Sequence, residues 1–293
     1  MSKIVCFGEV LWDIFPTHKK IGGAPLNVAC RLKSFNHDVV MMSAVGEDEN
    51  RYELIEHLQE QSVDTKHIQQ NTEYKTGEVN VMLNEKGIAS YDIAYPRAWD
   101  EIKLTESNKK AVSDADVFVF GSLVARDERS RNTLYQLLDL AKYKVFDLNL
   151  RPPYYTENVL LHLLNKADFI KFNDEELYEV AGFLGSKYNS LEQNLMFIAE
   201  NTNTRHICVT KGEHGAVLLY NEKLYYNSGY LIKLVDTVGA GDSFLGSLIS
   251  QLLKNVNPQQ AIDFACAVGA LVAQREGANP MIELDVVNQF INP

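Results

Sequence analysis

The chain has 293 residues, of which 46% are hydrophobic, and its formal net charge is −11. This length and composition suit a folded protein with a large core, and the negative charge argues against nucleic acid or an anionic membrane as a partner. The four cysteines include no Cys-x-x-Cys pair and the seven histidines no His-x-x-x-His pair, which argues against a structural zinc site.

The N-terminal residues carry one early lysine and no long apolar run. We therefore expect neither a signal peptide nor a membrane span, and the cytoplasm as the compartment. The scattered cysteines are expected to be buried, reduced thiols. Because no Pro/Ser/Gly-rich linker interrupts the chain, the composition gives no sign of two separate domains.

The first half of the chain begins with an apolar run over residues 2–8, which predicts a short buried strand. Apolar residues then recur at helical spacing and predict a helix over residues 25–35, with Pro25 in its first turn. A second strand and a second helix are expected next, and four more buried strands follow with helical patterns between them. These predictions cover residues 39–45, 51–61, 117–120, 145–148, 169–172 and 207–210.

Strands that alternate with helices imply right-handed crossovers and a mostly parallel sheet that is covered on both faces. One region breaks this rhythm. Residues 78–84 alternate polar and apolar side chains, residues 85–87 (Glu-Lys-Gly) supply a turn, and residues 90–95 continue as a strand. With a short strand at residues 11–15 and a turn at residues 19–23, they predict a small projecting β-sheet. An ordinary hairpin is the alternative.

Near the C-terminus, the sequence Asp236-Thr237-Val238-Gly239-Ala240-Gly241-Asp242 lies between an apolar, extended segment (230–235) and an amphipathic helix. The glycines let backbone amides turn outward, and a helix N-terminus favours an anion. A carboxylate beside such an anion site indicates a proton acceptor for phosphoryl transfer to a hydroxyl. A simple helix cap is the alternative. Neither the dinucleotide fingerprint nor the Walker P-loop is present.

This heptapeptide resembles the C-terminal signature of the ribokinase-like (PfkB) sugar kinases. The N-terminal motifs agree with it: Gly8-Glu9, Asp13, Gly22-Gly23-Ala24-Pro25-Leu26-Asn27-Val28-Ala29 and Val45-Gly46-Glu47-Asp48. The resemblance covers nearly the whole chain. It implies a three-layer α/β/α fold with a mostly parallel central sheet and a small β-sheet lid over the sugar. We expect the lid at residues 11–23 and 74–97, and the core at residues 1–10, 24–73 and 98–293.

The same resemblance assigns the site. Asp242 is expected to be the base, and the amides of the helix N-terminus at Gly239, Ala240, Gly241 and Asp242 are expected to form the anion hole. The expected sugar-binding residues are Asp13, Gly22, Gly23, Asn27, Tyr95, Arg97 and Arg151. The expected nucleotide-binding residues are Asn173, Thr210, Lys211, Gly212, Gly215, Cys266 and Asn279.

Two metal contacts are also implied by the resemblance. Glu176, with Asn173, is expected to order Mg²⁺ through water, and Asp236 stands where some relatives bind a monovalent cation such as K⁺. Several of these residues have structural alternatives. Asn173 and Glu176 also fit a helix capping box, Arg151 a surface salt bridge, and Lys211 a solvated loop charge. Many relatives have Asn at the position of Cys266, which leaves its adenine contact open.

The segment Tyr95-Pro96-Arg97-Ala98-Trp99-Asp100 resembles fructokinases, and therefore implies ATP- and Mg²⁺-dependent 6-phosphorylation of D-fructose. The alternatives are 2-keto-3-deoxygluconate kinase and ribokinase, which share the catalytic signature. A non-catalytic sugar-binding regulator on the same fold is an alternative from a different class. The expected partners are the sugar and ATP alone, and a homodimer through the lid edge is left open.

Overall fold

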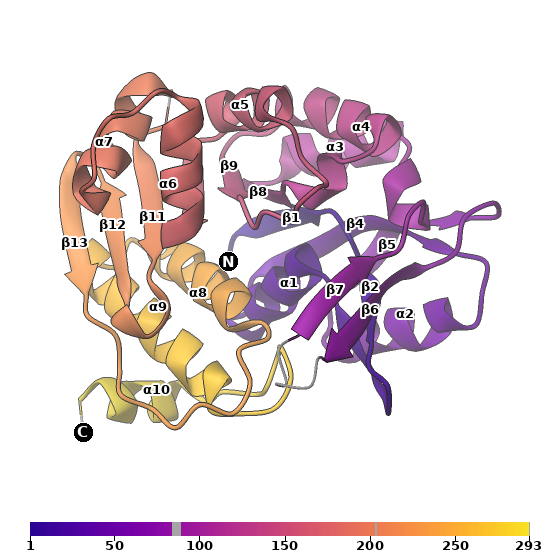
Figure 1. The fold of residues 1–293 in the computed structure, drawn as a ribbon. Helices are drawn as coiled ribbons and strands as arrows, with labels where there is room; N and C mark the ends of the chain where they lie inside the picture. Colours follow the sequence, from indigo (N-terminus) through magenta and orange to yellow (C-terminus); the bar gives the residue numbers. More distant parts are fainter. Residues whose placement is uncertain (84–88, 203, 293) are drawn as a thin grey trace.

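The computed structural model describes residues 1–83, 89–202 and 204–292. Within these residues, its larger sheet has nine strands in the order β13-β12-β11-β10-β9-β8-β1-β4-β5, and only β12 and β13 run antiparallel to their neighbours (Figure 1). The strands are β1 (Lys3–Phe7), β4 (Asp38–Gly46), β5 (Asp64–Asn71), β8 (Val117–Gly121), β9 (Lys144–Asp147), β10 (Phe169–Asn173), β11 (His206–Thr210), β12 (Ala216–Tyr220) and β13 (Lys223–Asn227). The predicted, mostly parallel sheet is confirmed.

Helices cover both faces of this sheet. They are α1 (Ala24–Ser34), α2 (Asn50–Glu60), α3 (Glu106–Asp114), α4 (Glu128–Leu138), α5 (Glu157–Lys166), α6 (Asp174–Phe183), α7 (Leu191–Asn201), α8 (Ala240–Leu253), α9 (Pro258–Ala273) and α10 (Leu284–Ile291), with short 3₁₀ turns η1 (Ala98–Glu101), η2 (Leu123–Ala125) and η3 (Gly212–His214). In the part of the chain that is described, no helix has both the length and the apolar character needed to cross a bilayer.

Two apolar cores separate the layers. In β1, Val5 and Phe7 pack in the core that contains residues of α3 to α7, whereas Ile4 and Cys6 pack in the core that contains residues of α1, α2, α8 and α9. Because successive side chains of a strand point to opposite faces, a strand covered on both faces is apolar throughout. This explains the continuous apolar runs in the sequence and confirms the three-layer α/β/α fold.

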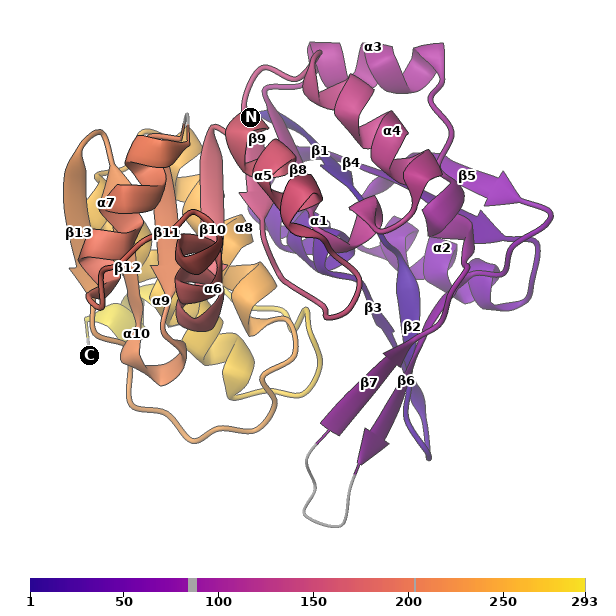
Figure 2. The ribbon, with the colours of Figure 1, turned by 45° about the horizontal axis from the view of Figure 1, so that its top comes forward.

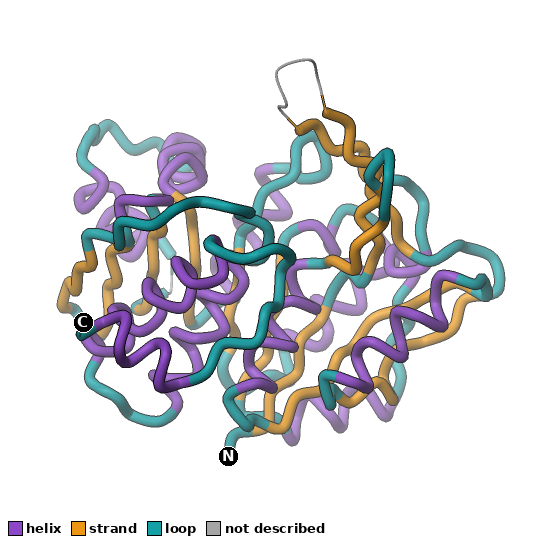
Figure 3. The backbone as a smooth tube through the Cα atoms, turned by 90° about the horizontal axis from the view of Figure 1, so that it is seen from below, coloured by secondary structure: helices purple, strands orange, loops and turns teal. Residues whose placement is uncertain are grey.

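A second sheet, which we call the small sheet, consists of β2 (Leu11–Ile14), β3 (Lys19–Gly22), β6 (Gly77–Leu83) and β7 (Ala89–Ile93), in the order β3-β2-β6-β7. It projects from the main body, as Figures 2 and 3 show from two sides. All four strands fall within the two segments expected to form a lid. The expected turn at residues 85–87 lies outside the described residues.

Some predicted elements were wrong or missing. The expected turn at residues 19–23 is strand β3, which pairs antiparallel with β2, and the chain turns earlier, where the Phe15 amide donates to the His18 carbonyl at 2.9 Å. Strands β5, β12 and β13 were not predicted; β5 is a polar edge strand (Asp-Thr-Lys-His-Ile-Gln-Gln-Asn) without the apolar signal. The apolar segment 230–235 belongs to no strand, and Leu231 within it is fully exposed.

Candidate active site

The N-terminus of α8 carries the glycine turn. Gly239 has a φ of 72°, and a Cβ there would lie 2.5 Å from the Ala278 Cα, so both conformation and space require glycine. Among the described residues, the amides of Gly239, Gly241 and Asp242 have no acceptor. The Ala240 amide donates to the Thr237 carbonyl at 3.2 Å. The Ala240 amide is therefore already engaged in the turn, and its contact with the anion stays a prediction. The free donors of the expected anion hole are at residues 239, 241 and 242.

Asp242 lies directly beside a residue expected to bind the sugar. The Asn27 side chain, from the first turn of α1, donates through Nδ2 to Oδ2 of Asp242 at 2.7 Å. Asn279 in turn donates through Nδ2 to Oδ1 of Asn27 at 2.9 Å. Asn27 is only 4% exposed, so this chain of hydrogen bonds holds its side chain in a fixed orientation. Helix α8 and the N-terminal motif thus meet at one point.

The environment of Asp242 keeps its carboxyl group weakly acidic. Burial raises the pKa of Asp242 to about 6, and the nearby Asp147 carboxylate adds to this increase. The Asn27 hydrogen bond and the charges of Lys171 and Arg151 act in the opposite direction. At neutral pH the carboxylate is therefore ionised, yet more basic than an exposed aspartate, which suits a general base.

The small sheet brings a second carboxylate toward this point. Asp13 projects from β2, and burial raises its pKa to about 6, while the charges of Arg151 and Lys20 lower it. A Cβ on Gly22 would collide with Oδ2 of Asp13, so this glycine makes room for the carboxylate. Gly23, with a φ of 116°, precedes α1, and a Cβ there would lie 2.5 Å from the Glu9 carbonyl oxygen.

Glu9 was not predicted as a separate site residue, although it belongs to the N-terminal motif. It is 3% exposed, and its Oε2 atom has no partner among the described residues. Burial raises the pKa of Glu9 to about 7, and the charge of Asp242 also raises it, whereas the charge of Arg151 lowers it. The exposed Arg151 guanidinium therefore acts electrostatically on three carboxylates that come from separate parts of the chain.

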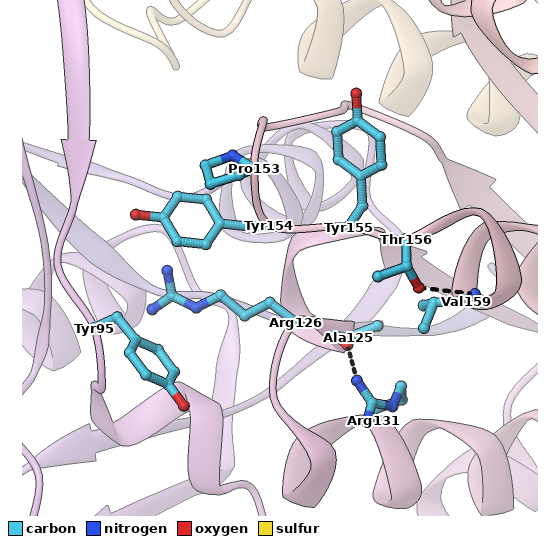
Figure 4. Close-up of a pocket in the computed structure, with 9 residues that line it drawn as sticks. All are labelled: Tyr95, Ala125, Arg126, Arg131, Pro153, Tyr154, Tyr155, Thr156 and Val159. Carbon is cyan, nitrogen blue, oxygen red and sulfur yellow. Dashed lines mark hydrogen bonds between the residues drawn. The ribbon is translucent and has the colours of Figure 1, made fainter.

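Tyr95 and Arg97 lie at the junction of the small sheet and the core. The Tyr95 hydroxyl donates to Oδ2 of Asp127 at 2.8 Å, and the Arg97 guanidinium pairs with Glu78 at 2.9 Å. Tyr95 lines a cavity of about 250 Å³, in which the Arg126 side chain extends between the rings of Tyr95 and Tyr154 (Figure 4). No described contact links Tyr95 or Arg97 to Asp13, so their sugar-binding role stays a prediction.

A buried ion pair lies next to the α8 N-terminus. Lys171 in β10 donates through Nζ to Oδ1 of Asp147, at the end of β9, at 2.9 Å, and both side chains are less than 10% exposed. The sequence analysis missed both residues. A usable signal was present, because Lys171 interrupts an otherwise apolar strand (Phe-Ile-Lys-Phe-Asn), and a lysine is rarely buried without a purpose.

Asn173 and Glu176 form the helix cap that was the structural alternative for them. The Glu176 amide donates to the Asn173 side chain, and the Asn173 amide donates to Oε2 of Glu176, both at 2.7 Å. Oε1 of Glu176 accepts from the Leu150 amide at 2.8 Å. The cap therefore holds the buried Glu176 carboxylate against the loop that carries Arg151, and its role with magnesium stays a prediction.

A larger cavity of about 780 Å³ opens beside α8 and α9. Of the expected nucleotide-binding residues, Thr210, Gly212, Gly215 and Cys266 line it. Ala240 and Gly241 form part of its wall, so the cavity reaches the free amides of the α8 N-terminus. Lys211 is not in the wall, and Asn279 contacts Asn27 instead. Residues not predicted for this wall include Tyr230, Leu231, Leu234, Phe244 and Ala270.

Asp236 has several partners. Its oxygens accept from the amides of Val238 at 3.0 Å and Gly277 at 3.2 Å, and the Lys20 ammonium lies 3.4 Å away. Burial would raise the pKa of Asp236, but these donors together lower it. Because Lys20 belongs to β3, this ion pair connects the small sheet to the glycine turn of the main body.

The whole chain is similar to known proteins. The model of the pfkB family carbohydrate kinases matches residues 1–284. A probable fructokinase-2 of Arabidopsis thaliana is 27% identical over 313 residues, which cover 96% of this chain and 93% of the relative. An uncharacterised sugar kinase of Pyrococcus horikoshii in complex with ATP is 26% identical, with a TM-score of 0.84 over 98% of this chain and 99% of that one. A fructokinase of Vibrio cholerae in a form with bound fructose, ADP and calcium is 24% identical, with a TM-score of 0.85 over 100% and 99%.

Proposed function

Since the chain belongs to the pfkB family of carbohydrate kinases, we propose that it transfers the γ-phosphoryl group of ATP to the 6-hydroxyl of D-fructose. The observation that carries this proposal is the 2.7 Å hydrogen bond between Asn27 and Asp242, because it joins the expected sugar pocket to the expected base. Relatives that are named fructokinases, and one structure of such a relative with bound fructose, support the choice of sugar.

In this proposal Asp242 accepts the hydroxyl proton. Its carboxylate keeps one oxygen on Asn27, so the side chain is oriented before the sugar arrives. A base with a pKa of about 6 is ionised at neutral pH and still accepts a proton as the oxygen–phosphorus bond forms. Asp13 and the Asn27 carboxamide would hold the other hydroxyls, since a carboxylate and an amide together offer both acceptors and donors.

The nucleotide would occupy the 780 Å³ cavity with its phosphates toward the α8 N-terminus. The three free amides, of Gly239, Gly241 and Asp242, would then lie beside the transferring phosphoryl group, and the helix dipole adds a favourable field. In a site from which water is excluded, each such donor contributes on the order of 3 kcal/mol to the transition state. The related sugar kinase structure with bound ATP supports this placement.

The residues at the edge of the sheet also fit a magnesium ion. Oδ2 of Asp147 is buried and has no partner among the described residues, and it lies near the Glu176 carboxylate, with which it interacts electrostatically. Oxygen donors that reach the ion through water suit Mg²⁺, which keeps several of its waters. Asp147 and Glu176 would hold the ion, which would supply charge neutralisation at the phosphates.

We further propose that the small sheet is a lid over the sugar, with residues 11–23 and 74–97 as the moving part. The Lys20–Asp236 ion pair supports this proposal, because it ties β3 to the turn before α8. The Lys20 ammonium also places a cation on the residue expected to bind K⁺, so an assay with and without K⁺ tests whether a second cation is needed. Light scattering tests the homodimer through the lid edge that the sequence leaves open.

The experiment that tests the function is ADP release, in the presence of Mg²⁺, with fructose, ribose, 2-keto-3-deoxygluconate, tagatose and adenosine as acceptors. The highest kcat/KM with fructose, and phosphorus NMR of the product at carbon 6, would support the proposal. A preference for ribose or 2-keto-3-deoxygluconate would assign one of the alternative kinases. Fructose binding by calorimetry without ADP release from any acceptor would identify a sugar-binding regulator.

A further inference from the structure

The Lys171–Asp147 ion pair is not required by the packing of the sheet. Both side chains are nearly fully buried between apolar strands, where removing charged groups from water costs a large free energy. Replacing a buried ion pair by apolar residues of similar volume is often neutral or stabilising. Here the Lys171 ammonium instead donates to Oδ1 of Asp147 at 2.9 Å. Because burial of this ion pair is unfavourable, its presence indicates a role other than stabilising the fold.

The direction of the lysine side chain indicates that use. Asp147 and Lys171 are paired in register on the parallel strands β9 and β10, with Asp147 at the carboxyl end of β9 and Lys171 in the middle of β10. The Lys171 Nζ atom lies 3.8 Å from the position that a Cβ on Gly241 would take. The ammonium is therefore next to the α8 N-terminus, beside Gly241, whose amide is free.

The ammonium group also has donors to spare. Of its three N–H groups, one donates to Asp147 at 2.9 Å, and no other acceptor for Nζ occurs among the residues in the described ranges. Gly241 leaves the space above Nζ open, since it has no side chain to cover it. An oxygen that binds the Gly241 amide would thus come within reach of a charged donor that the protein has already oriented.

Resting on the proposed kinase function, we propose that Lys171 is a catalytic residue that donates hydrogen bonds to the γ-phosphoryl oxygens, and that Asp147 is its positioning residue. During transfer, the sugar oxygen forms its bond to phosphorus and its proton passes to Asp242. The bond from the γ-phosphorus to the bridging oxygen breaks, and ADP keeps that electron pair. Lys171 keeps its proton throughout and stabilises the charge on the transferring oxygens.

The test compares the binding of two nucleotides, with no sugar present, so it does not depend on the identity of the sugar. Calorimetry with Mg²⁺ measures the dissociation constants of ADP and of the non-hydrolysable ATP analogue AMP-PNP for the parent protein and for Lys171→Met. We expect the variant to bind AMP-PNP about 10- to 100-fold more weakly, the usual effect of losing a charge-assisted hydrogen bond, while ADP binding changes little. Lys171→Arg should recover part of the loss, because it restores a charged donor.

Further variants make the result decisive. Lys171→Met leaves Asp147 buried without its partner, so the double variant Lys171→Met/Asp147→Asn tests the same contact without that unpaired charge. Its reference is Asp147→Asn alone, so that the change at the proposed magnesium ligand is the same in both proteins. The matched control is Lys144→Met, which removes a lysine–aspartate ion pair (2.8 Å, with Asp168) from β9 itself. It should leave both dissociation constants unchanged.

Equal weakening of ADP and AMP-PNP would overturn the γ-phosphoryl contact, as would an unchanged AMP-PNP affinity in the folded double variant. An unchanged affinity together with a shifted pH profile of kcat would mean that Lys171 acts only on the charge of Asp242. Failure of the proposed fructose kinase activity is a separate result, since it would appear in the acceptor panel and not in these affinities.

Discussion

Replacement of Asp242 by asparagine separates the chemistry of the site from its shape. The asparagine side chain oxygen can still accept the Asn27 hydrogen bond, so the geometry around α8 is retained. The variant cannot accept a proton, and losing a general base lowers kcat by about 100-fold or more. Sugar and nucleotide binding should change far less than kcat, because the groups expected to bind them are still present.

The same replacement should stabilise the protein, and the sign follows from the pKa. The pKa of Asp242 rises on folding from 3.8 to about 6, so the native state binds its proton more tightly than the unfolded chain does. The stability from this group is present below about pH 4 and is lost as the pH rises through about 6. The loss is at most about 3 kcal/mol, at about 1.4 kcal/mol per pH unit, and partial solvent access reduces it.

Asp236→Asn provides the opposite case. The pKa of Asp236 is lowered, so its carboxylate stabilises the protein above the unfolded pKa and ceases to do so as the pH falls. Urea unfolding near pH 8 should therefore show Asp242→Asn as more stable than the parent and Asp236→Asn as less stable. Near pH 4 the gain of Asp242→Asn should disappear. Turnover by Asp242→Asn close to the parent rate would refute the base, and a loss of stability near pH 8 would refute the electrostatic reasoning.

Three further predictions concern the sugar pocket, the junction and the pH profile. Gly22→Ala should push the Asp13 carboxylate aside and raise the KM for sugar by about 10-fold or more. The KM for ATP should stay unchanged and is the internal control. An unchanged KM for sugar would show that Asp13 does not bind it. Arg126→Met should destabilise the fold by about 3–5 kcal/mol in urea, because it leaves Asp100 buried without its partner at 2.7 Å, and adding Asp100→Asn should recover stability. A single variant as stable as the parent would contradict this. For the parent enzyme, kcat/KM should fall about tenfold per unit below pH ~6 as Asp242 takes up its proton, and a flat profile would argue against this base.

How far the sequence could predict the fold depended on burial. Strands such as β1 and β10 lie in the interior of a covered sheet, so their apolar runs were readable. The side chains of the edge strand β5 are partly exposed and therefore need not be apolar. Its sequence is polar, and no periodicity identified it. Strand β3 was taken for a turn since glycines follow two lysines there, and only pairing with β2 makes that segment extended.

Some residues of the candidate site have a local sequence signature, and others do not. The glycine turn and Asp242 could be recognised locally, because an anion site at a helix N-terminus has a short signature. The contact of Asp242 with Asn27 joins residues at opposite ends of the chain, and only the resemblance to a family suggested it. Asp147 and Lys171 carry no local signature, since each has meaning only as the partner of the other across two strands. The use of the Ala240 amide by Thr237 is a detail of turn geometry that composition cannot determine.

The hydrogen-bonded series Asn279–Asn27–Asp242 has a consequence for biosynthesis. A ribosome must add 252 residues after Asn27 before Asn279 exists, and the exit tunnel delays the emergence of Asn279 further. Nascent chains and proteolytic fragments that stop short of it would have a pocket whose base is poorly oriented. Co-expressed halves divided between the Asn27 and Asn279 segments should therefore regain turnover only when they reassociate.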